Sequence, residues 1–271
     1  MSTACRGGRI LFVLLSQPSS PQPASPYPAR PRPLHSPQHD APDRTAPRAD
    51  AWKPWVTYSL IAANLAMFAF ELAEGANLSG ATPQLMVALG GNFAPLTRNG
   101  EAWRLVTAMF LHYGAIHIAM NMVCLYQIGI VERMLGRAEF LALYFAAGLV
   151  GGLASLEIHP HAVSAGASGA VFGMFGAFAA LMVVRRKQIH PSAWRRTMQS
   201  LGTFFAINLV FGLAQSAIDL SAHFGGLAVG FIGAFALAKT AGPRSRPLLR
   251  ALVVAVVGAA TAFGGLYALP H

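Results

Sequence analysis

The chain has 271 residues, of which 54% are hydrophobic and only 11% are charged. Soluble globular domains carry roughly 25% charged residues, so this composition and the mean hydropathy of +0.47 indicate a membrane protein. The formal net charge of +10 does not indicate nucleic-acid binding, because the 20 Lys and Arg residues lie between apolar blocks. Cys5 and Cys124 are too few for a disulfide framework.

The first 50 residues form a region of different composition. Residues 16–50 are rich in Pro, Ser, Arg and Ala and show no hydrophobic period. Such a segment buries too little apolar surface to offset the entropy lost on ordering. The apolar run Ile10–Leu15 is too short for the core of a signal peptide. We therefore predict a disordered cytoplasmic tail over residues 1–50.

Seven apolar blocks follow, each close to the ~20 residues that cross a ~30 Å hydrocarbon core. They cover residues 55–72, 111–131, 140–156, 167–184, 201–218, 220–238 and 251–269. The fifth and sixth blocks are nearly continuous, and we divide them at Ser216 and Asp219 because one helix of that length would exceed the bilayer. The sequence thus predicts an all-α polytopic membrane protein.

Lys and Arg are distributed unevenly between the loops, which predicts the orientation of the chain. If the N-terminal tail is cytoplasmic, the outer loops carry only Arg98 and Arg104. The cytoplasmic loops then carry Arg133, Arg137, Arg185, Arg186, Lys187, Arg195, Arg196, Lys239, Arg244, Arg246 and Arg250. This bias predicts a C-terminus on the outer side of the membrane.

Polar residues inside membrane spans are costly and face a bundle interior or a water-filled cavity. Such residues are His112, His117 and Asn121 in the second block, Ser168 at the start of the fourth, and Asp219 and His223 at the start of the sixth. A rise of ~1.5 Å per residue, counted from the basic loops, puts Ser168, His223 and His117 at one depth, ~24–25 Å from the cytoplasmic side. Asn121 lies one turn deeper, on the helix face that carries His117.

A serine and a histidine at one depth are the minimum for nucleophilic acyl transfer. The imidazole of His223 can accept the Ser168 hydroxyl proton during attack and later donate it to the leaving amine. The oxyanion needs hydrogen-bond donors, which His117, Asn121 and the Ser168 backbone amide can offer. We interpret Asp219 as a helix cap, so the sequence predicts a Ser-His dyad.

Glycines near both residues support this geometry. Gly166 and Gly169 flank Ser168 and permit a sharp turn from a loop into the helix. Four glycines recur at a spacing that allows two helices to pack backbone to backbone: Gly169 and Gly173, and Gly226 and Gly230. Such packing is expected to bring Ser168 close to His223.

Each of these features also has a purely structural interpretation. A serine at the top of a transmembrane helix is usually a cap or an interhelical hydrogen bonder, and glycine pairs commonly only pack helices. His159 and His161 flank a proline in a loop, where such a pair is more often exposed than metal-bound, and the chain has no HExxH motif. The shared depth of the polar residues favours the enzymatic interpretation.

Three motifs at these positions resemble those of rhomboid proteases. Gly166-Ala167-Ser168-Gly169 resembles the GxSG signature of that family. Ala222-His223-Phe224-Gly225-Gly226, followed by Gly230, resembles AHxxGxxxG, and His117-Ile118-Ala119-Met120-Asn121 resembles HxxxN. The resemblance implies that Ser168 and His223 form the catalytic dyad and that His117 and Asn121 assist the Ser168 amide in holding the oxyanion.

Two further motifs extend the resemblance along the chain. Trp103-Arg104 is similar to the WR pair of the first outer loop, and Glu132-Arg133 with Gly136 is similar to the ExxxG that closes the second helix. The resemblance implies a six-helix catalytic core over residues 51–240. Residues 241–271 then supply the additional C-terminal transmembrane helix of the six-plus-one form.

The resemblance also implies a substrate class and a location. Family members cleave single-span membrane proteins within or near the outer half of the membrane, without a cofactor or metal. Their substrates tend to have small residues at the cut and helix-destabilising residues below it, since a helical amide must unwind before a nucleophile can reach it. We expect the inner membrane of a bacterium, with the lipid bilayer and transmembrane substrates as partners and no nucleic acid.

Phe172 occupies the place where members often have a tyrosine stacked on the catalytic histidine. Phenylalanine can still stack but offers no hydroxyl.

Two other functions compete with proteolysis. A non-catalytic rhomboid-like chaperone that binds transmembrane helices would keep its function in Ser168→Ala. A proton-coupled transporter is less favoured, because the chain shows no inverted repeat and no acidic relay in mid-membrane.

Overall fold

A computed structural model describes residues 52–214, 219–241 and 246–268. The predicted tail over residues 1–50 lies outside these ranges. The helices are α2 (Trp55–Ala73), α3 (Pro83–Ala88), α4 (Ala94–Thr97), α5 (Arg104–Thr107), α6 (Ala115–Ile128), α7 (Ile130–Leu135), α8 (Arg137–Ile158), α9 (Ser168–Val184), α10 (Pro191–Ala214), α11 (Leu220–Thr240) and α12 (Pro247–Ala268), with 3₁₀ turns at Ala108–Phe110 and Arg186–Gln188. The described residues contain no strand beyond two isolated bridges, so the all-α prediction is confirmed.

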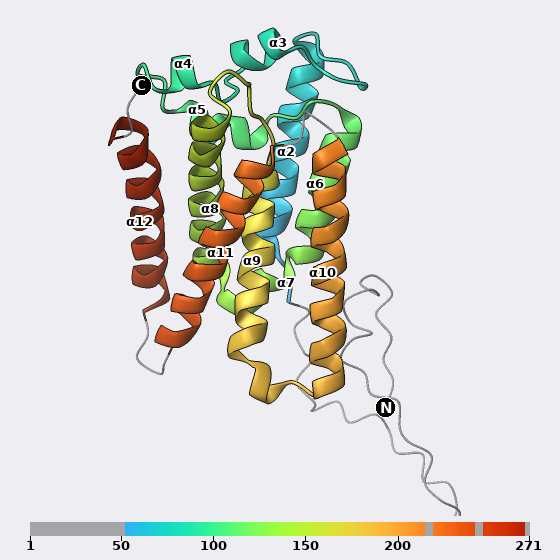
Figure 1. Cartoon of the computed structure of the whole chain (residues 1–271), viewed down its shortest axis with the longest axis vertical. Coiled ribbons are helices and arrows are strands. Elements are labelled where there is room, and N and C mark those ends of the chain that lie inside the picture. Colours follow the sequence, from blue (N-terminus) through green and yellow to red (C-terminus); the bar gives the residue numbers. More distant parts are fainter. Residues whose placement is uncertain (1–51, 215–218, 242–245, 269–271) are drawn as a thin grey trace, which may run out of the picture. The chain divides into compact units, whose positions relative to one another are not determined.

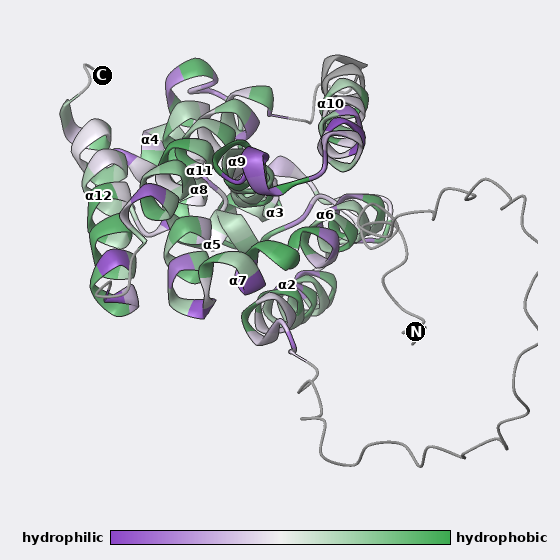
Figure 2. Cartoon of the chain, turned by 90° about the horizontal axis from the view of Figure 1, so that it is seen from below, coloured by the Kyte–Doolittle hydropathy of each residue, from purple (hydrophilic) through white to green (hydrophobic). Residues whose placement is uncertain are grey.

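Five segments among the described residues are long and apolar enough to cross a membrane. They are α2, α6 with α7, α8, α11 and α12. Helix α9 is apolar but has only 17 residues, and α10 is not among the five. Figure 2 shows helix bodies that are mostly green to white, with purple residues gathered at helix ends and in loops. The five segments match five predicted blocks, whereas the total of seven spans stays a prediction.

Helices α9 and α11 form the most extensive helix pair and touch through their backbones. A Cβ added to Gly226 would overlap the carbonyl oxygen of Gly169, and one added to Gly230 would overlap that of Gly173. Only glycine permits this approach, and small residues are the usual means of close helix packing in lipid. The predicted glycine-mediated packing is confirmed.

Helix α8 packs against α9 and α11 and also carries α12 (Figure 1). A Cβ on Gly258 of α12 would overlap that of Ala146 on α8, so these two backbones are also close. Near the basic end of the bundle, Arg250 of α12 pairs with the buried Glu139 of α8 at 3.2 Å. Helix α12 is therefore packed on α8 through both small residues and an ion pair.

The loop before α6 folds over the end of the bundle where α9 and α11 begin (Figure 1). Arg104 makes several of the polar contacts that hold this loop. It is buried and forms an ion pair with Glu101 at 2.7 Å. The same guanidinium donates to the carbonyl oxygens of Val87 and Gly91 at 2.6 and 3.2 Å. The arginine of the WR pair thus donates to two carbonyls of this loop; the Val87 carbonyl also accepts the Gly90 N–H at 3.2 Å.

Glu132 binds the N-terminal end of α2. Its carboxylate accepts hydrogen bonds from the backbone N–H groups of Val56 and Thr57 and from the Thr57 hydroxyl. These amides lie in the first turn of α2 and have no partner within the helix. The acidic residue of the ExxxG motif therefore caps one helix from another, and Gly136 ends α7 with a positive φ of 98°.

Several predicted helix starts are wrong. Helix α10 begins at Pro191 rather than at residue 201, so Arg195 and Arg196, predicted in a cytoplasmic loop, lie in this helix. Proline is favoured at a first helical position and starts the helix inside the polar segment.

The second apolar block was predicted to be helical from residue 111, but α6 begins at Ala115, so His112 lies in the segment that precedes the helix. The cause is Gly114, whose φ of 135° interrupts the helix and which lies so near Leu78 and Gly80 that an added Cβ would be crowded at 3.1 Å. Of the two residues at which the fifth and sixth blocks were divided, Asp219 caps α11, which begins at Leu220, and Ser216 lies outside the described residues.

Replacing Gly230 with alanine should destabilise the protein, because the new Cβ would force α11 away from the Gly173 carbonyl. Overpacking of this kind typically costs about 1–3 kcal/mol, which chemical unfolding in detergent would measure. Gly202→Ala is the matched control, since nothing lies within 4 Å of its added Cβ and alanine favours the helix. Equal stability of the two variants would contradict the backbone contact.

Candidate active site

Ser168 is the first residue of α9 and is half-buried. The preceding loop turns at Gly166, where φ is 135° and the N–H donates to the Ala108 carbonyl at 2.8 Å. A Cβ at Gly166 would lie 2.9 Å from the His117 ring. Glycine is therefore required here both for the turn and for the approach of the histidine.

His117 lies in the first turn of α6, with its ring directed toward the serine loop. The backbone N–H of Tyr113 donates to its Nδ1 at 3.4 Å, so Nδ1 is an acceptor and Nε2 carries the proton in the neutral ring. A Cβ at Gly166 would lie 3.0 Å from His117 Nε2 and 3.7 Å from Ser168 Oγ. The Nε2–H of His117 and the hydroxyl of Ser168 thus both border the space beside Gly166.

Asn121 lies one turn deeper on α6 and is buried. Its Nδ2 donates to the His117 carbonyl at 3.0 Å, which ties the side chain to its own helix. The structure therefore brings His117 to the serine loop more directly than it brings Asn121.

His223 lies in the first turn of α11 and is only 6% exposed. Its ring stacks on Phe172 with a centroid distance of 4.1 Å and an interplanar angle of 10°. The expected stacking of Phe172 is confirmed. Because Phe172 belongs to α9, one turn after Ser168, this contact orients the imidazole against the helix that carries the serine.

The first turns of α9 and α11 face each other. A Cβ on Gly169 would lie 3.3 Å from the carbonyl oxygen of Ala222. Gly169 follows Ser168 and Ala222 precedes His223, so the two residues of the predicted dyad occupy adjacent turns of two helices in backbone contact.

Asp219 caps α11, as predicted. Its carboxylate accepts hydrogen bonds from the N–H groups of Ser221 and Ala222 at 3.0 and 3.2 Å. Burial acts to raise the pKa of Asp219, but hydrogen bonds from Ser155, Ser221 and the Ala222 amide, with the charge of His159, outweigh it and lower the pKa. The carboxylate thus stays ionised at the positive end of the helix dipole.

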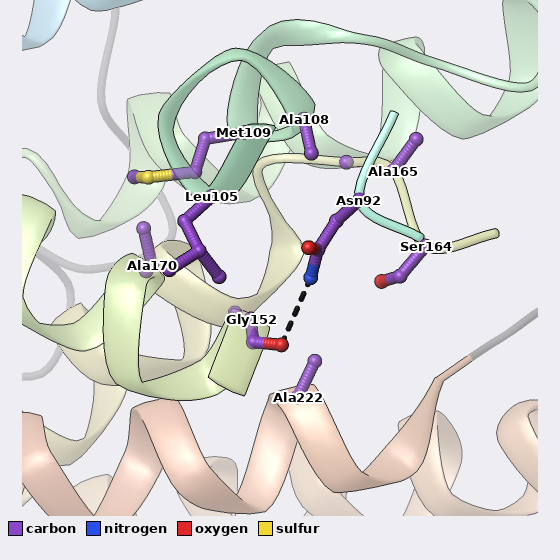
Figure 3. Close-up of a pocket in the computed structure, with 12 residues that line it drawn as sticks. Asn92, Leu105, Ala108, Met109, Gly152, Ser164, Ala165, Ala170 and Ala222 are labelled. Carbon is purple, nitrogen blue, oxygen red and sulfur yellow. Dashed lines mark hydrogen bonds between the residues drawn. The ribbon is translucent and has the colours of Figure 1, made fainter. Parts of the chain in front are cut away.

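A small cavity of about 20 Å³ lies beside the glycines that flank Ser168 (Figure 3). Its lining includes Asn92, Gly152, Ser164, Gly166, Gly169 and Ala222. Asn92 points across it and donates from Nδ2 to the Gly152 carbonyl at 2.9 Å. Since a water molecule needs about 10–15 Å³ by this measure, the cavity has room for one water next to the serine loop.

Two residues near the site were missed from the sequence. Asn92 gave no signal, because it lies in a loop without a motif. Glu71 did give one, since it is an acid inside the first apolar block. Its buried carboxylate accepts the backbone N–H of His112 at 3.0 and 3.2 Å.

His112, His159 and His161 belong neither to the predicted dyad nor to the predicted oxyanion donors. His159 and His161 are exposed in the loop after α8. His112 is fully buried next to the His117 ring, with a centroid distance of 5.1 Å. Burial, with a smaller contribution from His117, lowers the pKa of His112 to about 3, so this ring is neutral at neutral pH.

Comparisons with known proteins point to one family. The Rhomboid domain matches residues 99–240. The chain is 38% identical to rhomboid protease GluP of Bacillus subtilis (strain 168) over 81% of this chain and 42% of that protein. It is 34% identical to the putative rhomboid protease YdcA of the same organism over 51% of this chain and 68% of that protein. For rhomboid protease AarA of Providencia stuartii, the identity is 29% over 65% of this chain and 69% of that protein.

The chain spans about two fifths of the length of GluP, so that relative contains regions with no counterpart in this alignment. The domain match covers more than half of the 271 residues and includes Ser168, His223, His117 and Asn121. The chain is a multi-pass membrane protein that belongs to the rhomboid family of serine proteases.

Proposed function

We propose that this chain is an intramembrane serine endopeptidase in which Ser168 is the nucleophile and His223 the general base. The observation that carries the proposal is the backbone contact of α9 with α11, which sets these residues on facing first turns. The stacking of His223 on Phe172 supports it further, because a ring held against α9 presents its nitrogens at a fixed orientation.

The proposed reaction uses these residues in sequence. Ser168 Oγ attacks the carbonyl carbon of the scissile bond, and His223 accepts the hydroxyl proton. The C–N bond then breaks, and His223 donates the proton to the leaving amine. Water then gives a proton to His223 and attacks the acyl-enzyme ester. The bond between the acyl carbon and Ser168 Oγ breaks, the carboxylic acid is released, and His223 returns the proton to Ser168 Oγ. The cavity lined by Gly166 and Gly169, the glycines on either side of Ser168, has room for one water.

Stabilisation of the oxyanion falls to donors at the serine loop. Ser168 opens α9, so its amide N–H has no acceptor within the helix and lies at the positive end of the dipole. The His117 Nε2–H borders the same space. We assign Asn121 a supporting part, because its amide donates to the His117 carbonyl and steadies the first turn of α6.

The proposed substrates are single-span membrane proteins with helix-destabilising residues, cut in or near the outer half of the membrane. A transmembrane helix shields its own amides, so a segment that unwinds readily reaches Ser168 at lower cost. The proposed topology has seven spans, including α9 and α10, with the N-terminus in the cytoplasm and the C-terminus outside a bacterial inner membrane. The distribution of Lys and Arg supports this orientation.

Ser168→Ala and His223→Ala should each lower the rate of substrate cleavage by about three orders of magnitude or more, since nucleophile and base act as a unit. Cleavage of a single-span substrate with a destabilised helix, by purified protein in detergent, provides the measurement. His161→Ala, in an exposed loop, is the control and should cleave normally. Undiminished cleavage by Ser168→Ala would contradict Ser168 as the nucleophile and remove the serine protease assignment. No cleavage by the wild-type protein, with binding of the transmembrane helix retained, would favour a non-catalytic chaperone.

His117→Ala should lower kcat by about 10²–10³-fold with little change in KM, because an oxyanion donor acts mainly in the transition state. Asn121→Ala should cost less, since its amide is bonded to the His117 carbonyl. Steady-state kinetics on the same substrate would measure both effects. A rise in KM without a fall in kcat would assign His117 to substrate binding instead.

A further inference from the structure

Tyr113 connects the two parts of the chain that meet at the proposed oxyanion site. Its backbone N–H donates to Nδ1 of His117 at 3.4 Å. Its phenol hydroxyl donates to the carbonyl oxygen of Val163 at 2.8 Å. Val163 lies five residues before Ser168, in the loop that carries Gly166. One residue thus joins the donor histidine to the loop of the proposed nucleophile.

The two bonds of Tyr113 act on different properties of the site. The bond to Nδ1 fixes the neutral His117 ring with its proton on Nε2, the nitrogen that borders Gly166. The bond to Val163 fixes the distance between this histidine and the serine loop. Main-chain bonds from Ser164 to Asn92 and from Gly166 to Ala108 hold neighbouring parts of that loop, but neither reaches α6.

The segment that carries Tyr113 is itself held from α2. Glu71 and His112 are both fully buried, and the Glu71 carboxylate accepts the His112 N–H. The edge of the His112 ring packs on His117. The backbone around Tyr113 is therefore held in place by α2. Because that backbone is fixed, the bond from the Tyr113 hydroxyl to Val163 restrains the loop before Ser168.

We propose that Tyr113 is a positioning residue, whose hydroxyl keeps the serine loop in register with the His117 donor. This role builds on the proposed protease function. The two bonds of Tyr113 end on His117 and Val163 rather than on Ser168 or His223, so its effect would pass through His117 and the loop. Burial raises the pKa of Tyr113 to about 12, so the phenol keeps its proton and remains a donor across the pH range in which a histidine base operates.

Tyr113→Phe removes the hydroxyl alone and keeps the ring and the backbone bond to His117. We expect kcat to fall about tenfold with KM and the melting temperature nearly unchanged, because one lost hydrogen bond and a small misplacement act on the transition state. Tyr126→Phe is the matched control: this tyrosine lies near the far end of α6, is half exposed, and should behave as wild type. Purified full-length protein and the single-span substrate are used throughout.

A double-mutant cycle with His117→Ala separates positioning from a general structural effect. If Tyr113 acts through His117, then Tyr113→Phe should change the single-turnover rate less than twofold once His117 is absent. The rate of Ser168 labelling by a fluorophosphonate gives a second readout of the same four proteins. An equal loss in both backgrounds, or wild-type kcat in Tyr113→Phe, would overturn the proposal.

Failure of this inference is distinguishable from failure of the protease assignment. Loss of cleavage in Ser168→Ala together with full activity in Tyr113→Phe would reject only the positioning role. Cleavage that survives in Ser168→Ala would reject the proposed function itself, and the positioning role with it.

Discussion

The backbone contact between α9 and α11 is the constraint on which the rest of the structure depends. Lipid gives helices no hydrophobic reason to associate, so close packing relies on small residues and van der Waals contact. Gly169 and Gly173 meet Gly226 and Gly230 so closely that a single methyl group would separate the helices. This contact sets the relative height of the two helices, and with it the relative height of their polar first turns.

The proposed oxyanion side of the site is built differently. It comes from a loop and the start of α6, and it is held by hydrogen bonds that span long distances in the sequence. The Glu71 carboxylate holds the segment before α6, Arg104 donates to the Gly91 carbonyl in the loop after α3, and Asn92 links that loop to α8. The site therefore joins a rigid helix pair to a hydrogen-bonded loop, and small changes in the loop should affect rate more than stability.

Much of this arrangement was predictable because its signals are local. Apolar blocks of ~20 residues, separated by basic loops, identify helices directly, and the capping role of Asp219 followed from its place before an apolar block. Hydropathy does not register backbone conformation, so the turn at Gly114 was missed and His112 was assigned to a helix. The partner of Glu71 is brought to it only by tertiary folding, and no periodicity in the sequence identifies such a pair.

Covalent labelling tests the central claim most directly. A fluorophosphonate reacts with a serine only when a neighbouring base activates the hydroxyl and donors receive the developing charge. Mass spectrometry of the labelled wild-type protein should find the adduct on Ser168, and His223→Ala should label far more slowly. An adduct on another serine, or equally fast labelling of Ser168 in His223→Ala, would contradict a dyad formed across α9 and α11.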